Sequence, residues 1–317
     1  MPFQKIAVSS PSFCKNALLV SELKSTFHDS QIELNSSGNH LKGNDLIQFF
    51  QGADAIIVGT EIINRDIINP LENLKILSKY GVGMDNIDTT YLEEKRIHFH
   101  WKGGVNRRSV SEMSLAFLIG LSRNLFFTNS KLKSGHWIKN GGFELSGKTI
   151  GIIGCGFIGE DLIRLLQPFH CNILINDIVD KSEVVSCYGV KQVELDYLIS
   201  NSDLISLHVP LTTKTRGLVD KKFLSNMKKN SYLINTCRGG VIIEEDLKDF
   251  LNRSLIQAQD ATLMGAALDV LAIEPSFDIE FLNLPNLFVT PHIGGNAMEA
   301  VLAMGRSAIN GLKIYIK

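Results

Sequence analysis

A glycine-rich segment stands directly between an apolar run and an amphipathic stretch near the middle of the chain. Residues 154–159 spell GCGFIG, the run TIGII precedes them, and EDLIRLL follows them. In a strand–turn–helix unit of this spelling, the first glycine permits a tight turn and the second lets the backbone approach a pyrophosphate. The third permits close packing of helix on strand, and the helix N-terminus then faces the phosphates. The segment therefore predicts a parallel α/β domain that binds a dinucleotide.

An acidic residue at the end of the next apolar run indicates which dinucleotide is bound. Asp177 stands eighteen residues after the last glycine of the segment, and no basic residue stands at 178 or 179. A carboxylate there accepts hydrogen bonds from the adenosine ribose and repels a 2′-phosphate. The sequence therefore predicts NAD rather than NADP as the cofactor.

Short apolar runs alternate with amphipathic stretches along the whole chain. In the first part, strands are expected at 5–9, 31–34, 55–59, 75–79 and 97–101, and helices at 16–27, 43–51, 64–72 and 89–96. In the second part, strands are expected at 149–153, 172–176, 204–209, 231–235, 265–270 and 287–290, and helices at 160–169, 194–201 and 244–252. Links this long exclude hairpins and favour parallel strands. The fold class predicted is α/β, with two doubly wound parallel-sheet domains, Rossmann-like or flavodoxin-like, and a cleft between them.

The chain length also favours two domains, because a single core usually stops growing below 317 residues. Ser109 with Glu112 spells a capping box, which predicts a long helix between the domains. After Pro291 a single helix, about 297–314, is expected, and it is too short to form a domain. We therefore expect a discontinuous substrate-binding domain, 1–102 with 291–317, and a dinucleotide-binding domain, 103–290.

Composition excludes several classes of partner. The 32 basic and 33 acidic side chains give a net charge of -1, which provides no field for nucleic acid or an anionic membrane. The five cysteines form no CxxC pair and no His/Cys cluster, so neither a metal site nor a disulfide framework is indicated. No run approaches the length of a membrane span, and the N-terminus lacks the pattern of a signal peptide. The expected protein is cytoplasmic and acts on a small molecule.

Further segments at the ends of the expected strands carry a resemblance to a known family. They are YGVGMDNID at 80–88, HVPLT at 208–212, NTCRGG at 235–240, ALDV at 267–270 and TPHIGG at 290–295. With the glycine segment, their order and spacing closely resemble the D-isomer-specific 2-hydroxyacid dehydrogenases, which include phosphoglycerate, glycerate and D-lactate dehydrogenases. The resemblance covers nearly the whole chain. It implies an NAD-dependent enzyme that moves a hydride between the cofactor and C2 of a D-2-hydroxy acid or 2-keto acid.

Three catalytic residues follow from this resemblance. Oxidation of a secondary alcohol needs a base for the hydroxyl proton, and His292 matches the family's base, with an ordinary pKa near neutrality. Glu274 matches the acid that pairs with this histidine and raises its pKa. Arg238 matches the arginine that grips the substrate carboxylate and carbonyl oxygen with its forked guanidinium.

Cofactor and substrate contacts are expected at the same strand ends. Asp269 lies near the nicotinamide by resemblance, and the 81–83 amides match the loop that receives the substrate carboxylate. The predicted cofactor-binding residues are Gly154, Gly156, Phe157, Ile158, Gly159, Asp177, His208, Val209, Pro210, Thr215, Thr236, Cys237, Arg238, Asp269, His292, Gly294 and Gly295. The predicted substrate-binding residues are Lys79, Tyr80, Gly81, Val82, Gly83, Asn106, Arg238 and His292.

The identity of the substrate stays open. The segment 101–109 is unusually basic and, with Lys79, could hold a second anionic group such as the phosphate of 3-phosphoglycerate. The alternative is a solvated basic turn. Two functions on the same scaffold also stay open: an NADH-sensing corepressor that binds partner peptides, and a phosphite-type dehydrogenase.

Two further expectations concern segments outside this set. An insertion relative to the family at 257–262 leads into the N-terminal end of a strand, away from the expected active edge, so we expect it not to affect the chemistry. The aromatic-rich stretch 122–145 resembles the family's dimerisation arm, which predicts a homodimer.

Overall fold

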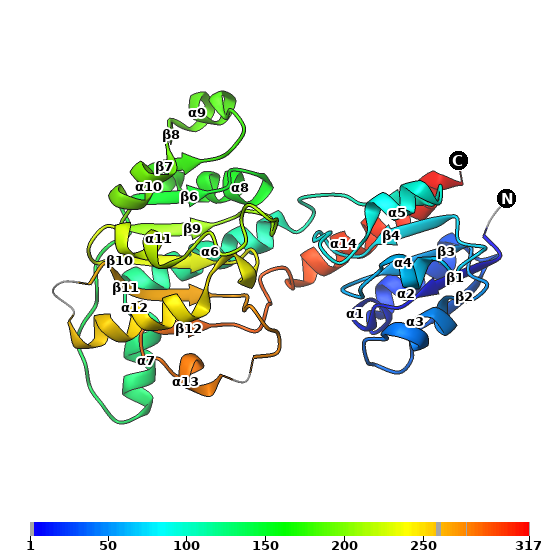
Figure 1. The fold of residues 1–317 in the computed structure, drawn as a ribbon, viewed down its shortest axis with the longest axis horizontal. Helices are drawn as coiled ribbons and strands as arrows, with labels where there is room; N and C mark the ends of the chain where they lie inside the picture. The colour runs from blue at the N-terminus through cyan, green and yellow to red at the C-terminus, as the bar shows by residue number, and fades with distance from the viewer. Residues whose placement is uncertain (1–2, 258–260, 277, 317) are drawn as a thin grey trace. The chain divides into compact units, whose positions relative to one another are not determined.

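The computed structural model describes residues 3–257, 261–276 and 278–316. By its contacts the chain divides into two compact units, Met1–Asn106 with Met298–Lys317, and Arg107–Ala297 (Figure 1). The sequence-based boundaries stand after residues 102 and 290. Each unit contains one parallel sheet with helices on both faces, so the predicted fold class is confirmed.

The first unit contains a five-stranded parallel sheet in the order β2-β1-β3-β4-β5. Its strands are β1 Lys5–Val8, β2 Gln31–Leu34, β3 Ala55–Val58, β4 Ile76–Lys79 and β5 His98–His100. Its helices are α1 Pro11–Cys14, α2 Ala17–Thr26, α3 Gly43–Phe50, α4 Arg65–Ile68, α5 Thr89–Glu94 and α14 Met298–Tyr315. Asn16, Asn64 and Asp88 cap α2, α4 and α5 by accepting a first-turn N–H, which is why those helices begin where they do.

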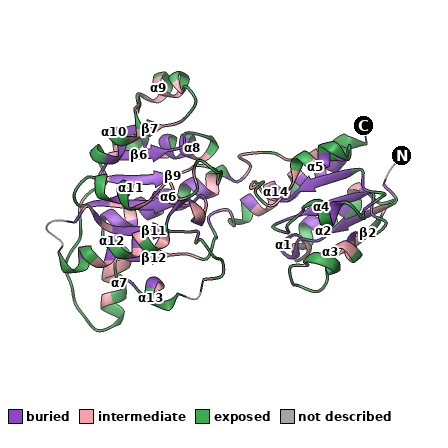
Figure 2. Cartoon of the chain, in the orientation of Figure 1, coloured by how far each residue is buried: buried purple, intermediate pink, exposed green. Residues whose placement is uncertain are grey.

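Successive side chains of these strands enter different cores. Ile6 and Val8 of β1 pack with α2 and α14, whereas Ala7 between them packs with α3 and α4. Because both faces of the sheet are covered, β3 and β4 are buried along their whole length (Figure 2). The C-terminal helix α14 thereby belongs to the core of the first unit.

The second unit contains a seven-stranded parallel sheet in the order β12-β11-β10-β9-β6-β7-β8. Its strands are β6 Thr149–Ile153, β7 Asn172–Asn176, β8 Lys191–Gln192, β9 Leu204–Leu207, β10 Ser231–Asn235, β11 Leu263–Leu268 and β12 Leu287–Val289. Its α-helices are α6 Arg107–Ser122, α7 Leu125–Lys133, α8 Phe157–Leu166, α9 Ser182–Tyr188, α10 Leu195–Asn201, α11 Lys221–Asn226, α12 Glu244–Ile256 and α13 Ile279–Leu282. Short 3-10 turns, η1 Gln167–Phe169 and η2 Gly239–Val241, complete it.

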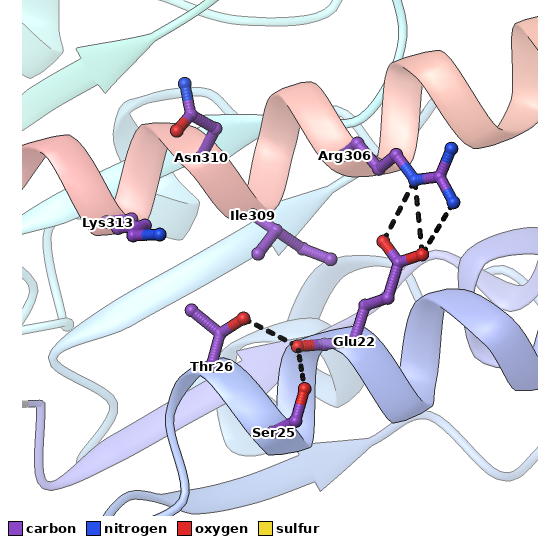
Figure 3. A pocket seen from close by; sticks show the side chains of 7 residues that line it. All are labelled: Glu22, Ser25, Thr26, Arg306, Ile309, Asn310 and Lys313. Atoms are coloured by element: carbon purple, nitrogen blue, oxygen red, sulfur yellow. Dashed lines mark hydrogen bonds and ion pairs between the residues drawn. The ribbon is translucent and has the colours of Figure 1, made fainter.

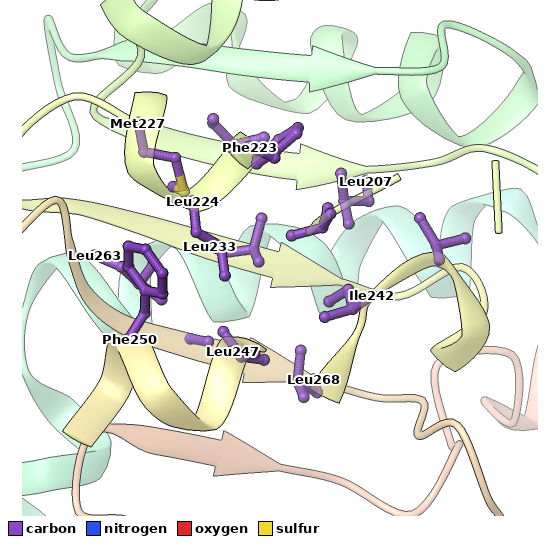
Figure 4. Close-up of a cluster of buried hydrophobic side chains, with 14 of the residues drawn as sticks. Leu207, Phe223, Leu224, Met227, Leu233, Ile242, Leu247, Phe250, Leu263 and Leu268 are labelled. Atoms are coloured by element: carbon purple, nitrogen blue, oxygen red, sulfur yellow. The ribbon is translucent and has the colours of Figure 1, made fainter. Parts of the chain in front are cut away.

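Helices cover both faces of this sheet as well. One face packs against α6 and α8, and the other packs against α10, α11 and α12, where leucines and phenylalanines fill the space above β9 and β10 (Figure 4). The strand order reverses between β6 and β9, because the chain runs from β6 outward to β8 and then returns to the far side of β6. In doubly wound sheets ligands bind at the carboxyl ends of the strands beside such a reversal.

Two details differ from the sequence-based expectation. The helix expected to begin at Ser109 begins at Arg107, so Ser109 is not its cap; its Oγ donates instead to the carbonyl oxygen of Gly294 at 2.5 Å. The two-residue strand β8 was not predicted, because two residues give no readable alternation. Of the insertion 257–262, residues 258–260 lie outside the described residues.

Three further features bear on the expected class of protein. Within the described ranges, no single helix is long and apolar enough to cross a membrane, although the bent pair α6 and α7 passes by length and composition. All five cysteines are free, and Cys187 on α9 is the exposed one. Among the described residues, no three His, Cys, Asp or Glu side chains come together as a metal site.

Candidate functional site

The glycine segment forms the turn from β6 into α8. Gly154 has φ +92°, and a Cβ there would lie 2.5 Å from the carbonyl oxygen of His208. At Gly159 a Cβ would lie 2.3 Å from the carbonyl oxygen of Gly154. Both glycines are therefore required by packing. Gly156 differs, because it caps α8 at an exposed position and a Cβ there would meet nothing within 4 Å.

The free space at Gly156 is the observation that tests the predicted cofactor. No atom of the described residues fills the space beside Gly156, so a ligand can approach its backbone there. This space lies at the N-terminus of a ten-residue helix, where backbone N–H groups can bind an anion. Phe157 beside it is exposed, and Ile158 is half-buried. These residues fit a pyrophosphate held by backbone N–H groups.

Asp177 follows β7 and lies against this turn. Its Oδ2 accepts the Cys155 N–H at 2.8 Å, and its Oδ1 accepts the Val179 N–H at 3.0 Å. The Lys181 Nζ lies 3.8 Å from Oδ2. Asp177 also lines an open pocket of about 580 Å³, with Asn176, Gln192, Val193, Glu194 and Tyr197. A carboxylate beside a pocket of this size suits an adenosine. The sequence did not predict that Gln192 of β8 and Tyr197 of α10 line this pocket.

Residues after β9 and β10 face the glycine turn across the strand reversal. His208 pairs through Nε2 with the Ser206 hydroxyl at 2.8 Å, and burial lowers its pKa to about 3. This histidine is therefore neutral. The Thr236 Oγ1 lies 2.9 Å from the Ser114 Oγ, and the Cys237 thiol donates to the Asn235 Oδ1. These three side chains stabilise the loops that carry the predicted cofactor contacts. Val209 is half-buried, Pro210 is exposed, and the Thr215 hydroxyl accepts the Thr212 N–H to close the turn beyond them.

Arg238 is the residue before η2, three positions after the end of β10. Its Nη1 donates to the Cys237 carbonyl oxygen at 2.7 Å, and its own carbonyl oxygen accepts from the Asn235 Nδ2 at 2.9 Å. Its positive charge favours the ionised form of Glu274 and opposes, in small part, the protonation of His292. Both members of that pair therefore experience the Arg238 charge.

His292 and Glu274 form a hydrogen-bonded ion pair. The His292 Nδ1 lies 2.7 Å from the Glu274 Oε2, and both side chains are partly exposed. The bond to Glu274 raises the pKa of His292, and burial opposes this only in part. Burial alone would raise the pKa of Glu274, but the bonds from His292 and from the Leu271 N–H together bring it below its usual value. Since Nδ1 is occupied, Nε2 is the atom left to exchange a proton with a substrate.

Asp269 supports the His292 loop from the end of β11. The carboxylate is buried; its Oδ1 accepts from the Thr290 hydroxyl at 2.6 Å and the Ile293 N–H at 2.9 Å, and its Oδ2 accepts the Gly294 N–H at 2.7 Å. A Cβ on Gly294 would lie 2.7 Å from that oxygen, so this position has no room for a side chain. Gly295 beyond it is half-buried. Family resemblance predicts that Asp269 lies near the cofactor; its anchoring of the His292 loop was not predicted.

In the first unit, the predicted substrate loop follows β4. Tyr80 is buried against Phe13, and Gly81 takes φ +127°, a conformation that favours glycine. Gly81, Val82 and Gly83 are partly exposed, and Trp101 donates its indole N–H to the Val82 carbonyl oxygen at 2.9 Å. Asn106, at the end of this part of the unit, is buried.

Two of the cations proposed to hold a second anion are bound by protein groups. The buried Lys79 Nζ donates to the Gly59 carbonyl oxygen and to the Asn86 Oδ1. Arg108 donates to the buried Asp161 at 2.9 Å, and Arg164 donates to the same oxygen at 2.7 Å. Asp161 also accepts from the Ser111 hydroxyl and so links α6 to α8. Both groups therefore have structural partners.

A second pocket in the first unit lies away from these residues. It is about 220 Å³, lies between α2 and α14, and includes the Glu22–Arg306 ion pair, whose shortest distance is 2.7 Å (Figure 3). None of the predicted site residues lines it.

Comparison with known proteins places this geometry in a family. Residues 115–294 match the family model described as D-isomer specific 2-hydroxyacid dehydrogenase, NAD binding domain. The chain is 36% identical over 278 residues to a D-3-phosphoglycerate dehydrogenase of Methanocaldococcus jannaschii, covering 86% of this chain and 52% of that protein. It is 34% identical to a hydroxypyruvate reductase of Thermotoga maritima, covering 86% of this chain and 88% of that protein.

A solved structure agrees over the whole chain. The crystal structure of a glyoxylate reductase from Paecilomyes thermophila superposes with a TM-score of 0.84 at 25% identity and covers 100% of this chain and 96% of that one. The chain thus spans about half the length of the phosphoglycerate dehydrogenase relative and nearly all of the two reductases. The match of 115–294 to an NAD-binding domain confirms the predicted cofactor. The chain belongs to the D-isomer-specific 2-hydroxyacid dehydrogenase family.

Proposed function

We propose that this protein is an NAD-dependent oxidoreductase that interconverts a D-2-hydroxy acid and the corresponding 2-keto acid. The observation that supports this most directly is the 2.7 Å pair of His292 and Glu274, held in the same unit as Arg238 and the glycine turn. The first unit, with its loop of partly exposed glycines, would bind the substrate, and the second would bind the cofactor. Family membership supports the same assignment.

The roles follow from the chemistry of each group. When bound, NADH supplies a hydride to C2 of the keto acid. The imidazolium of His292 donates the Nε2 proton to the keto oxygen, and Glu274 stabilises the imidazolium before that transfer. In the opposite direction, neutral His292 accepts the hydroxyl proton. Arg238 provides a permanent positive charge for the substrate carboxylate and for the oxygen on which negative charge develops.

The size of the substrate is the finer part of the proposal. The three relatives are named for phosphoglycerate, hydroxypyruvate and glyoxylate, so the family alone does not choose among them. Lys79 and Arg108, two of the cations named for a second anion, are held by Asn86 and Asp161, which leaves the exposed Lys102 and Arg107 of the basic segment. We therefore favour a small unphosphorylated 2-keto acid such as glyoxylate or hydroxypyruvate. The corepressor and phosphite alternatives receive no support from these relatives.

A substrate panel tests this proposal. Purified protein would be assayed for NADH oxidation with glyoxylate, hydroxypyruvate, pyruvate, 2-ketobutyrate and phosphohydroxypyruvate. We expect turnover of an unphosphorylated member, with the His292→Ala variant as the control for catalysis by this site. Tight NADH binding without turnover of any member would contradict the assignment as an enzyme of 2-keto acids, and preference for the phosphorylated compound would contradict the choice of size.

We also propose that the protein is a cytoplasmic homodimer formed through the stretch 122–145, which contains α7. Trp137, Leu132 and Leu125 are exposed there, which is unfavourable for a monomer in water. Phe126 is an exception, because its ring stacks on that of Phe288, with centroids 3.6 Å apart, and packs against the core. Sedimentation of the wild type and of Trp137→Glu tests this, and a wild type that sediments as a monomer would refute it.

A further inference from the structure

Two successive backbone N–H groups, of Leu271 and Ala272, donate to two different carboxylates just before Glu274 in the chain. The Leu271 N–H donates to the Glu274 Oε1 at 2.9 Å, and the next N–H, of Ala272, donates to the Glu244 Oε1 at 2.6 Å. The first bond lies within the 271–274 loop, so it shapes the loop but cannot fix where the loop lies. The second bond comes from the first residue of α12 and ties the loop to a thirteen-residue helix.

A glycine contact ties the same peptide to the arginine segment. A Cβ on Gly239 would lie 1.9 Å from the carbonyl carbon of Leu271 and 2.4 Å from the nitrogen of Ala272. The two backbones therefore touch, and Gly239 directly follows Arg238. The short segment from Gly239 to Glu244 thus contacts the 271–272 peptide at both of its ends.

Glu244 has an environment that costs free energy for a charged group. Burial raises its pKa, and the nearby carboxylates of Glu245, Asp278 and Glu274 raise it further, against the hydrogen bond from Ala272. Glu245 on the same helical turn is exposed, so it lacks this environment. Burying a carboxylate close to another carboxylate costs free energy, which a hydrogen bond can offset. The bond from the Ala272 N–H is the contact that offsets this cost at Glu244.

We propose that Glu244 is a positioning residue for the catalytic pair, and this inference rests on the proposed dehydrogenase function. By holding Ala272, Glu244 keeps the 271–274 loop against the Arg238 segment, so that the Glu274 Oε2 meets the His292 Nδ1. It acts through Glu274 and does not touch the substrate. Its loss therefore changes the protonation of His292 as well as the rate.

Three variants separate this role from general stabilisation. Glu244→Ala removes the acceptor, Glu244→Gln keeps an acceptor oxygen and removes the charge, and Glu245→Ala is the matched control on the same turn. Measurements are kcat and KM for the keto acid, KM for NADH, the pH profile of kcat/KM, and the His292 pKa from NMR of the labelled imidazole. Among the described residues, the charged groups that act on the pair are Glu244, Asp269 and Arg238, and each variant at position 244 changes only the first of them.

For Glu244→Ala we expect kcat to fall about ten- to a hundredfold, as a small displacement of catalytic groups does, with KM for NADH nearly unchanged. The His292 pKa should fall toward its ordinary value, so that keto-acid reduction is lost at lower pH than in the wild type. Glu244→Gln should recover most of the rate and of the His292 pKa.

Glu245→Ala should match the wild type in rate and in His292 pKa. A Glu244→Ala protein that is less stable but keeps the wild-type His292 pKa and kcat would overturn the proposal, as would an equal effect of Glu245→Ala. If Glu244→Ala fails to fold, the test uses Glu244→Gln, which keeps the acceptor oxygen. A His292 pKa as low as that of Glu274→Gln would then show that the accepted hydrogen bond does not hold the pair, and would overturn the proposal. A wild type inactive on every keto acid would refute the proposed function alone, because the NMR titration needs no turnover.

Discussion

Replacing Asp269 with asparagine should release the loop that carries His292. The carboxylate accepts three hydrogen bonds, two at Oδ1 and one at Oδ2, from Thr290, Ile293 and Gly294. An asparagine has one acceptor oxygen, so whichever way it turns, its NH₂ group faces at least one of these donors. A hydrogen bond to a charged group contributes about 1.5–3 kcal/mol, and a buried donor left unpaired costs about 1–3 kcal/mol. We expect a loss of roughly 2–4 kcal/mol of unfolding free energy.

Urea unfolding followed by circular dichroism measures this loss. Asp246→Asn is the matched control, because the Asp246 Oδ2 accepts a single N–H, from Lys221, and an asparagine can turn its oxygen to that donor. The control should cost less than about 1 kcal/mol. The reasoning fails if Asp269→Asn unfolds at the wild-type urea concentration with an unchanged slope and keeps the wild-type kcat.

Four further outcomes are expected. Removing the imidazole in His292→Ala should lower kcat by about 10²–10⁴-fold while NADH, titrated by fluorescence, still binds; a rate close to wild type would exclude the residue as acid or base. The pKa of His292 is raised by Glu274, so kcat/KM for keto-acid reduction should be retained below that raised pKa and fall as pH rises through it, and in Glu274→Gln the fall should come at lower pH. Asp177→Ala should weaken NADH and reduce its advantage over NADPH, measured as the ratio of their kcat/KM values; an unchanged ratio would contradict the ribose contact. Gly154→Ala should destabilise the protein by roughly 1–3 kcal/mol because of its positive φ and blocked Cβ, whereas Gly156→Ala should melt as the wild type does and raise the KM for NADH.

Local sequence patterns were sufficient for the elements around the cofactor. The β6 and β7 strands begin and end at the expected residues, and Asp177 lies beside the glycine turn, because strand, turn and acid are close in the chain. The pairing of Glu274 with His292 came from family resemblance. Nothing in the seventeen residues between them specifies a 2.7 Å contact.

Contacts between separate loops could not be predicted in the same way. The bond from Ala272 to Glu244 joins residues 28 apart, and it depends on the backbones at Gly239 and Leu271 meeting. Ser109 fitted a capping box, but α6 begins two residues earlier and the hydroxyl binds the Gly294 carbonyl instead. In each case tertiary packing decides which partner a polar group finds, and a sequence pattern reports only local partners.

The distribution of the thiols makes the protein convenient to label. Burial raises the pKa of Cys155, Cys171 and Cys237 to about 11 and also raises that of Cys14, so these side chains stay protonated and react slowly with alkylating reagents. Cys187 is exposed on α9, the helix that follows the Asp177 loop. A maleimide dye used at one equivalent near neutral pH should therefore attach at Cys187 in the unmodified chain. Because α9 leads into β8, whose Gln192 lines the pocket beside Asp177, a change in emission on adding NADH would test the predicted cofactor site without any engineered cysteine.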